Sequence, residues 1–425
     1  MTHSKPRLSL PAAPVAQLRP KPVVPLRPKP DVETGQAPWI QPGVVVHDPD
    51  DRIDGLLAQF ALGLRGRGFN VAGYVQGNNQ GCTGTSQGCA PRISYFDVAS
   101  GETLNVERGA ATHYLRTAMR ENADLLVISR FAACTEATED VGAEVSAVGG
   151  HGMPLLTSIA GGCIHKWHSY ARQDGAMIAP DIGALWRWWG PERLYRDLIL
   201  GIADDPVHRI ACGSRWMMVQ GPHGTGLSYT AKPPHEIKAR SAFYQGRSLR
   251  ELAGLALSWD AAEMALGIAA INAHYNRHDL DGRAGNGVRG LRKISGRMVA
   301  VGAFPGIDGI LPQCQVIETD PRPGEFPVVA METLLPGCAA AVVNSSALVN
   351  RSLPRILRLT PNRPVALIGP ATPMTPRLFD YGLDLLGGLQ VSDPDGLAAA
   401  IRAGALPREF SKFGKFIHIQ NKSKI

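Results

Sequence analysis

The chain has 425 residues and a mass of 45.5 kDa, which is enough for two or three domains with hydrophobic cores of their own. Apolar residues make up 44% and charged residues 19%, with 47 glycines and 33 prolines, so collagen-like and wholly disordered chains are excluded. No apolar run approaches the roughly 18 residues of a membrane span, and no signal-peptide core is present, so we expect a cytoplasmic protein without a membrane span.

The first segment, residues 1–40, is rich in proline and in basic residues. It repeats the sequence LRPKP and places six Lys and Arg residues before its first acidic residue, Asp31. Because the whole chain carries +7, removing these six leaves a net charge of +1 for the rest. We predict a disordered, extended arm that keeps the protein in solution or contacts a protein partner, nucleic acid or membrane headgroups.

The seven cysteines do not form the pattern of a disulfide framework. Their number is odd and no C-x-x-C pair occurs. We therefore expect unpaired thiols in a reducing compartment. The seven are Cys82, Cys89, Cys134, Cys163, Cys212, Cys314 and Cys338.

Strands and helices alternate over residues 41–203, which predicts a parallel α/β domain. Strands are expected around 44–46, 69–76, 124–129 and 153–159, with helices at 53–64 and 113–121. The LWRWWG stretch holds Trp186, Trp188 and Trp189 and indicates a packing or domain-docking cluster. Single-strand nucleic-acid binders interleave aromatic with basic residues along a groove, and this pattern is missing, so we expect no specific nucleic-acid binding.

A small α+β domain is predicted over residues 204–280. Short antiparallel strands at 209–220 and 224–231 are followed by two helices, one starting at the capping box of Ser248 and Glu251 and one after Asp260. Residues 279–290 read as a glycine-rich linker. From 288 to 421 a second α/β pattern predicts a Rossmann-like domain, with strands at 297–302, 315–320, 339–346 and 365–370 and a helix at 351–359.

The clearest ligand-binding pattern follows the first strand of this C-terminal domain. Gly302, Gly306 and Gly309 form a turn where helix amides could receive an anion, although the spacing is not G-x-G-x-x-G. Glu318 ends the next strand, where dinucleotide-binding folds hold a ribose hydroxyl. Ligand binding and plain turn geometry both stay open for the glycines.

Polar residues and tight turns also follow the later strands. Asn344, Ser345 and Ser346 end one strand, and the segment from Gly369 to Pro373 ends the next. Parallel α/β sheets bind ligands at the carboxyl edge of their strands. The sequence therefore predicts one polar edge built from several strand ends.

Residues 207–420 resemble a bacterial and archaeal family known as putative heavy-metal chelation proteins, in which an enolase-N-terminal-like domain precedes a Rossmann-like domain. The resemblance lies in GRSLRELAGLALSWDAAEMALGIAAINA, VGAFPGID, LLPGCAAAVVNSSALVNRSL and GPATPMTPRLFDYG. It implies a ligand site in the cleft between the two domains. The implied residues are Glu263, Asn272, Phe304, Glu318, Asn350, Thr372 and Pro373. The family pattern has Thr-Gly where this chain has Asn344-Ser345, and Ser in place of Ala371.

The first folded domain resembles a second bacterial family, of unknown function, that is related to P-loop NTPases and linked with molybdenum handling. The matching stretches are GLRGRGFNVAGYVQ, YFDVASGETL, ADLLVISRFAACTEA and HGMPLLTSI. No G-x-x-x-x-G-K-[ST] follows the first strand, where HDPDDRIDG stands instead. We therefore expect no NTP at this domain.

Two histidine-containing groups are candidate metal ligands. His274 and His278 are four residues apart and would share a helix face, and Cys163, His165 and His168 form C-x-H-x-x-H. Exposed histidines and a buried cysteine are the alternative interpretation. A bare cation in the cleft would use Glu263 and Glu318 or the histidines.

These observations favour a protein that binds a transition metal, a molybdate-like oxyanion or a metal-loaded small molecule, for trafficking, storage or cofactor assembly. One alternative is an enzyme acting on a small nucleotide-like substrate at the Rossmann-like sheet edge, although no nucleophile, base and orienting group are evident together. Another is a non-catalytic scaffold that recruits a partner through the arm or the first domain. A homo-oligomer also stays open.

Overall fold

The computed structural model describes residues 40–48, 52–76, 93–106, 123–130, 153–171, 175–230, 244 and 246–421. The chain divides into the units Met1–Gln36 and Ala37–Ile425, and every described residue belongs to the second. The predicted arm, up to residue 39, and the predicted helix at 113–121 lie outside the described residues. No helix among the described residues is long and apolar enough to cross a membrane.

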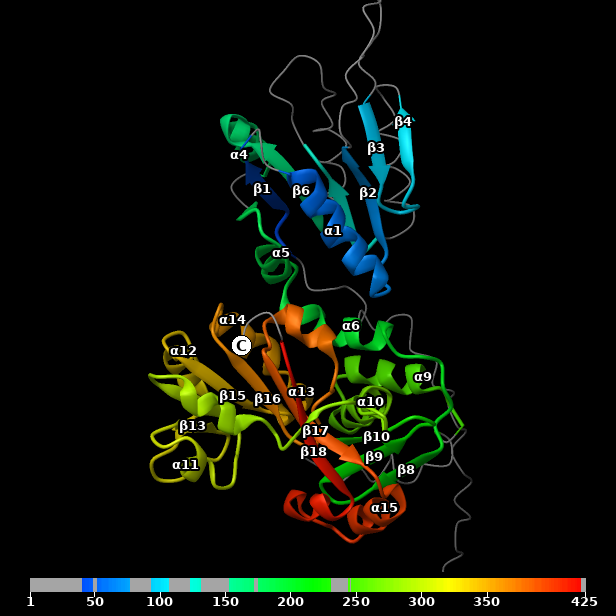
Figure 1. The fold of residues 1–425 in the computed structure, drawn as a ribbon, viewed down its shortest axis with the longest axis vertical. Coiled ribbons are helices and arrows are strands. Elements are labelled where there is room, and N and C mark those ends of the chain that lie inside the picture. The colour runs from blue at the N-terminus through cyan, green and yellow to red at the C-terminus, as the bar shows by residue number, and fades with distance from the viewer. Residues whose placement is uncertain are drawn as a thin grey trace, which may run out of the picture. The chain divides into compact units, whose positions relative to one another are not determined.

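The N-terminal sheet has seven strands in the order β4-β3-β2-β5-β6-β1-β7. Strands β4, β3 and β2 lie side by side at one edge (Figure 1). Its strands are β1 (Gly43–His47), β2 (Val71–Gln76), β3 (Ile93–Asp97), β4 (Thr103–Val106), β5 (Leu125–Ile128), β6 (Leu155–Ala160) and β7 (Ala176–Ile178). The predicted strands are present. Strands β2, β5, β6, β1 and β7 pair in parallel in that order. The sheet is mixed, however, because β3 and β4 add an antiparallel hairpin at one edge.

The helices of this region pack their apolar residues on the sheet and on one another. They are α1 (Ile53–Gly66), α4 (Ile164–Ala171), α5 (Ile182–Trp189) and α6 (Leu194–Leu200), with 3-10 turns η1 (Gly161–Cys163) and η2 (Pro191–Arg193). Phe60 of α1 meets Trp186 edge to face at 5.4 Å, and Trp189 is fully buried against Phe69. Trp186 also contacts Tyr381, so the tryptophan cluster is a packing cluster, as predicted.

The middle region is a three-stranded antiparallel sheet covered by helices. Its elements are β8 (Arg209–Cys212), β9 (Trp216–Gln220), β10 (Thr225–Tyr229), α9 (Leu249–Gly254), η3 (Leu255–Leu257) and α10 (Ala261–Tyr275). Ser248 and Glu251 form the predicted capping box, and Asp260 caps α10 through the amides of Ala262 and Glu263. Ten consecutive residues of α10 are buried, which explains its apolar sequence.

The C-terminal sheet has eight strands in the order β11-β18-β17-β16-β15-β12-β13-β14. Its strands are β11 (Arg283–Ala284), β12 (Met298–Val301), β13 (Gln315–Glu318), β14 (Phe326–Pro327), β15 (Ala340–Asn344), β16 (Val365–Ile368), β17 (Leu385–Val391) and β18 (Gly414–Gln420). Strands β14, β13, β12, β15, β16 and β17 pair in parallel in that order. Strand β18 is antiparallel to β17, and β11 is antiparallel to β18. The interpretation of 279–290 as a linker is wrong, because β11 pairs with β18 and forms the edge of the sheet.

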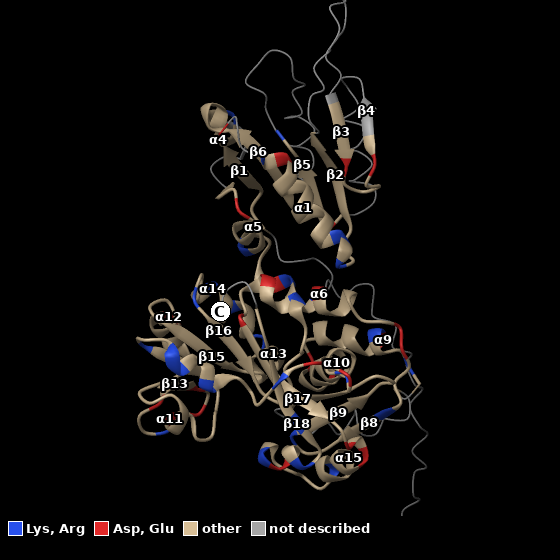
Figure 2. Ribbon diagram, viewed as in Figure 1, with Lys and Arg blue, Asp and Glu red and all other residues tan. Residues whose placement is uncertain are grey.

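Short helices connect these strands, and charged residues lie mainly outside the sheets. The connections are η4 (Val288–Lys293), α11 (Ile307–Ile310), η5 (Val328–Ala330), α12 (Met331–Leu334), α13 (Ser346–Val349), α14 (Leu353–Leu359), η6 (Pro376–Tyr381), α15 (Pro394–Arg402) and η7 (Pro407–Lys412). Figure 2 shows Lys, Arg, Asp and Glu mixed over helices and loops, while most strands are uncharged. This mixture agrees with the nearly neutral charge predicted after the arm.

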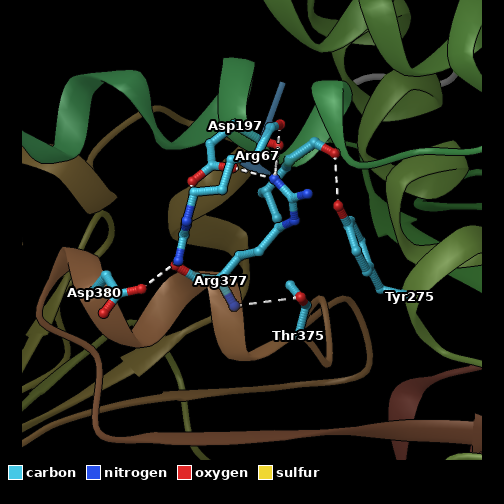
Figure 3. Close-up of polar contacts among 7 residues, drawn as sticks. Arg67, Asp197, Tyr275, Thr375, Arg377 and Asp380 are labelled. Atoms are coloured by element: carbon cyan, nitrogen blue, oxygen red, sulfur yellow. Dashed lines mark hydrogen bonds and ion pairs between the residues drawn. The ribbon is translucent and has the colours of Figure 1, made fainter. Parts of the chain in front are cut away.

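A buried ion-pair cluster joins three distant segments of the chain. Asp197 of α6 has no exposed side-chain surface and pairs with both Arg67, after α1, and Arg377 of η6 (Figure 3). Arg67 also pairs with Asp380 and lies over the Trp186 ring at 4.5 Å. The carboxylate of α6 therefore fixes the end of α1 to the segment between β16 and β17.

Candidate functional site

The predicted polar edge lies at the point where the strand order of the C-terminal sheet reverses. Strand β12 lies between β13 and β15, and all three are parallel. The parallel order β14-β13-β12-β15-β16-β17 thus places the first strand in the middle, which is the arrangement of dinucleotide-binding folds. A crevice at the carboxyl ends of β12 and β15 is the expected ligand position in such a sheet.

Gly302 and Asn344 lie on the two sides of this position. Gly302 has φ of +93°, and a Cβ atom there would lie 2.6 Å from the Asn344 Cβ, so the approach requires glycine. The Asn344 Nδ2 group donates to the Ala303 carbonyl at 2.8 Å, and its Oδ1 accepts from the Ser346 amide at 3.0 Å. Asn344 therefore holds both loops together.

The loop after β12 offers unused backbone donors. The N–H groups of Ala303, Phe304 and Gly306 donate no hydrogen bond to any residue that the structure describes. Phe304 is half-buried and packs on the core, whereas the two other residues are exposed. These amides can hold an anion at the edge of the sheet.

Ser345 and Gly369 are brought together but are buried. Ser345 is 1% exposed, and a Cβ at Gly369 would overlap the Ser345 hydroxyl. Ser346, half-buried beside them, begins α13. Of this serine pair, Ser346 is therefore the one accessible to a ligand.

Glu318 lies one strand further along, at the end of β13. It is half-buried, and its Oε2 accepts from the Thr319 amide at 2.8 Å. Its carboxylate stands at the position predicted from the sequence. An anion bound at the β12 loop would meet this negative charge at the same edge of the sheet.

Asn272, Thr372 and Pro373 are brought together in the interior rather than on an open surface. Asn272 donates through Nδ2 to the carbonyls of Leu227 and Ala371, at 2.7 and 2.9 Å. Asn272 Oδ1 and Thr372 Oγ1 are buried without a hydrogen-bond partner in the described part of the chain. These residues fasten α10 to the segment after β16, and a ligand reaches them only if that contact opens.

Glu263 and Asn350 lie at the other end of α10. Glu263 accepts from the Ser258 hydroxyl at 2.6 Å, and Asn350 Oδ1 accepts from the Ser352 amide and hydroxyl. Arg351 joins the two sides, because its Nη2 donates to the carbonyls of Ala256 and Ser258, both at 3.0 Å.

Arg351 was not predicted from the sequence. Its guanidinium lies over the rings of Trp259, at 4.4 Å, and Tyr195, at 5.4 Å, and burial lowers its pKa. Trp259 is 80% exposed, so one of its faces stays open to solvent beside Glu263. Only the position of Arg351 directly after Asn350 could have indicated its importance.

The histidine and cysteine groups do not form a metal centre. No group of three His, Cys, Asp or Glu side chains able to hold a metal occurs among the described residues. Helix α10 ends at Tyr275, so His278 lies beyond it and the shared-face argument for His274 and His278 is wrong. Burial lowers the pKa of His274, which packs edge to face on the Tyr275 ring.

The expectation of unpaired thiols is also wrong at Cys163. Cys163 is disulfide-bonded and therefore has no thiolate to give to a metal together with His165 and His168. Cys212, Cys314 and Cys338 are not disulfide-bonded, and burial raises the pKa of Cys314 to about 11. Neither observation supports a thiolate ligand.

Three family models match consecutive parts of the chain. Residues 195–275 and residues 291–420 match two models that carry the same description, "Putative heavy-metal chelation", and residues 43–188 match "Protein of unknown function (DUF2478)". The first two descriptions support metal binding in general. The matched residues contain the sheet edge, α10 and Arg351.

Similar proteins were found for both halves. The N-terminal region is 24% identical over 161 residues to the Molybdenum import ATP-binding protein ModC 2 of Bradyrhizobium diazoefficiens, covering 34% of this chain and 18% of that protein. Crystal structures of DUF364-family proteins of unknown function from Desulfitobacterium hafniense and Pyrococcus horikoshii each cover 54% of this chain and 98% of theirs. Their identities are 26% and 20%, with TM-scores of 0.49 and 0.46.

The order of these segments follows the order of the sheets. The DUF2478 match covers the N-terminal sheet, and the two remaining matches cover the middle sheet with α10 and the strands β12 to β18 of the C-terminal sheet. Residues 195–275 and 291–420 thus match the two models described as putative heavy-metal chelation, and they follow a segment that matches the DUF2478 model.

Proposed function

We propose that the C-terminal half binds a metal in anionic form, as a molybdate-like oxyanion or as a metal held by a small organic chelator, at the crevice between β12 and β15. Such a protein would serve metal trafficking, storage or cofactor assembly. The similarity of the N-terminal region to a protein named for molybdenum import makes molybdate the first ligand to test.

The unused amides of Ala303, Phe304 and Gly306 carry this proposal. They lie beside Asn344 and Ser346, so the nearby donors are neutral amide and hydroxyl groups that suit an oxyanion. A bare transition-metal cation would instead need several carboxylate, imidazole or thiolate ligands. The described residues contain no group of three such side chains.

Ligand-induced thermal stabilisation tests the proposal. Molybdate, tungstate, sulfate and the chlorides of zinc, iron and copper are compared, followed by calorimetric titration of those that raise the Tm. We expect molybdate or tungstate to raise the Tm of the wild type and not that of the Asn344→Ala, Ser346→Ala variant. The exposed Ser295→Ala substitution is the matched control. A shift that is unchanged in the double variant excludes this crevice.

Trp259 offers a second measurement. Because it is 80% exposed beside Arg351, its fluorescence should change when a ligand binds next to Arg351 and Glu263. The Trp259→Phe variant should lose this signal and keep the calorimetric heat. A fluorescence response that persists in Trp259→Phe comes from another tryptophan and leaves ligand binding beside Arg351 without support.

The sheet order favours a second candidate, a nucleotide-like ligand or substrate. Glu318 ends the strand next to β12, which is the position that binds a ribose hydroxyl in dinucleotide-binding folds. Glu318→Gln separates the candidates. The substitution removes a negative charge beside a bound oxyanion, so it should preserve or strengthen oxyanion binding. It should weaken the binding of a nucleotide-like ligand whose ribose hydroxyl is held by the carboxylate.

A further inference from the structure

A depression lies at the carboxyl end of β17, four strands away from β13 and apart from the sheet edge at β12. Its volume is about 670 Å³, and it is open to solvent. It is formed by the end of β17, the start of α15, the turn from η7 into β18, and the residue three positions beyond α10. The lining residues are His278, Gln390, Val391, Ser392, Pro394, Ser411, Lys412, Gly414 and Lys415.

The lining carries positive charge without a carboxylate to balance it. Lys412 and Lys415 are exposed, and neither side chain forms an ion pair or hydrogen bond with the residues that the structure describes. Three acidic side chains near in sequence have partners of their own. Asp393 caps α15 through the Gly396 amide, Asp395 pairs with Arg209, and Asp279 pairs with Arg277.

The frame of the depression is held by buried hydrogen bonds. Gln390 is 5% exposed, and its Nε2 lies 2.9 to 3.0 Å from the carbonyl oxygens of Arg277, His278 and Leu280. The His278 Nδ1 lies 3.1 Å from the Val391 carbonyl, and because a carbonyl only accepts, Nδ1 carries the hydrogen. The turn that presents His278 is therefore fixed before any ligand arrives.

The hydroxyl groups of the lining are weakly held. Ser392 and Ser411 each donate to a backbone carbonyl at 3.4 Å, to Phe413 and Arg408 respectively, which is long for a hydroxyl. Either hydroxyl can turn to a better acceptor. Val391 and Pro394 add apolar surface on the same wall.

We propose that this depression binds the phosphate group of a small organic molecule. Lys412 and Lys415 would neutralise the phosphate, Ser392 and Ser411 would donate to its oxygens, and Val391 and Pro394 would contact the organic part. A volume of about 670 Å³ is in the range of small-molecule sites and larger than inorganic phosphate needs. The site is independent of the metal crevice.

Equilibrium binding of inorganic phosphate, at constant ionic strength set with chloride, tests the charge and hydroxyl part of the site. We expect saturable binding of one phosphate per chain, weakened about tenfold or more in Lys412→Gln, Lys415→Gln. Lys293→Gln, an exposed lysine of η4, should bind like the wild type. Absence of saturable binding to the wild type, or equal binding by the double variant, overturns the proposal.

Chemical protection gives a test that needs no substitution. Phosphate should slow the reductive methylation of Lys412 and Lys415, but not of Lys293, when modification is followed by mass spectrometry. Equal rates with and without phosphate contradict the proposal. The Asn344→Ala, Ser346→Ala variant should keep phosphate binding here, so failure of the metal crevice and failure of this site are distinguishable.

Discussion

Arg67 and Asp197 form an ion pair across 130 residues of sequence, and the Asp197 carboxylate is completely buried. Arg377 approaches the same carboxylate, with its Nη1 2.5 Å from Oδ1. A carboxylate in this position neutralises two arginines that are themselves mostly buried, at 14% and 23% exposure. The cluster therefore depends on Asp197 more than on either arginine.

Asp197→Asn should destabilise the protein strongly. The substitution leaves Arg377 without this carboxylate and Arg67 with the partly exposed Asp380 alone, and breaking a buried pair in this way costs about 3 kcal/mol or more. We expect a clear fall in the Tm and in the denaturant midpoint. Glu332→Gln, which breaks the exposed pair with Arg355, is the control and should change neither. If both variants lose the same amount of stability, burial of the Asp197 ion pairs does not determine their contribution.

A matched pair of glycine substitutions measures how closely β10 packs on α10. A Cβ at Gly226 would overlap backbone atoms of Ala269 and Ala273, so Gly226→Ala should cost about 1–3 kcal/mol. Gly254 is the last residue of α9, has helical dihedral angles and has no atom within 4 Å of an added Cβ. Gly254→Ala should instead stabilise by about 0.5–1 kcal/mol, as judged from urea unfolding. If both substitutions change the free energy of unfolding in the same direction, the prediction is wrong.

Local signals in the sequence account for most of the fold that could be predicted. The capping box at Ser248 and the cap at Asp260 depend on neighbours within three residues, and both are present. The polar sheet edge was predictable for a similar reason, since parallel strands align their carboxyl ends. Gly302 and Asn344 meet there as that rule requires.

The features that the sequence did not reveal depend on distant partners. β11 has two residues in a glycine-rich stretch and exists because β18 lies beside it. Asn272 and Thr372 are polar residue types that are usually exposed, yet the contact of α10 with the segment after β16 buries both. The disulfide of Cys163 likewise has no local pattern.

His274 should make stability depend on pH. Burial lowers its pKa below the ordinary value of 6.5. As the pH falls through about 6.5, the unfolded chain takes up a proton that the folded protein does not, so the free energy of unfolding decreases on acidification. His274→Gln should reduce the difference in Tm between about pH 7.5 and about pH 5.5, and the exposed His223→Gln should not. An unchanged pH dependence in His274→Gln contradicts the lowered pKa.

Arg351→Lys should loosen the contact between the segment after α13 and the loop that carries Trp259, without removing positive charge. The guanidinium donates from one nitrogen to the carbonyls of Ala256 and Ser258 while it lies over the Trp259 ring, and an ammonium group lacks this planar geometry. We expect a stability loss of about 1 kcal/mol and altered Trp259 fluorescence in the absence of ligand. Arg355→Lys, on the exposed face of α14, is the matched control and should leave the fluorescence unchanged. If Arg351→Lys keeps the wild-type Tm and emission, the guanidinium does not hold the loop that carries Trp259, and Glu263 owes its position to the Ser258 hydroxyl and the Asp260 cap alone.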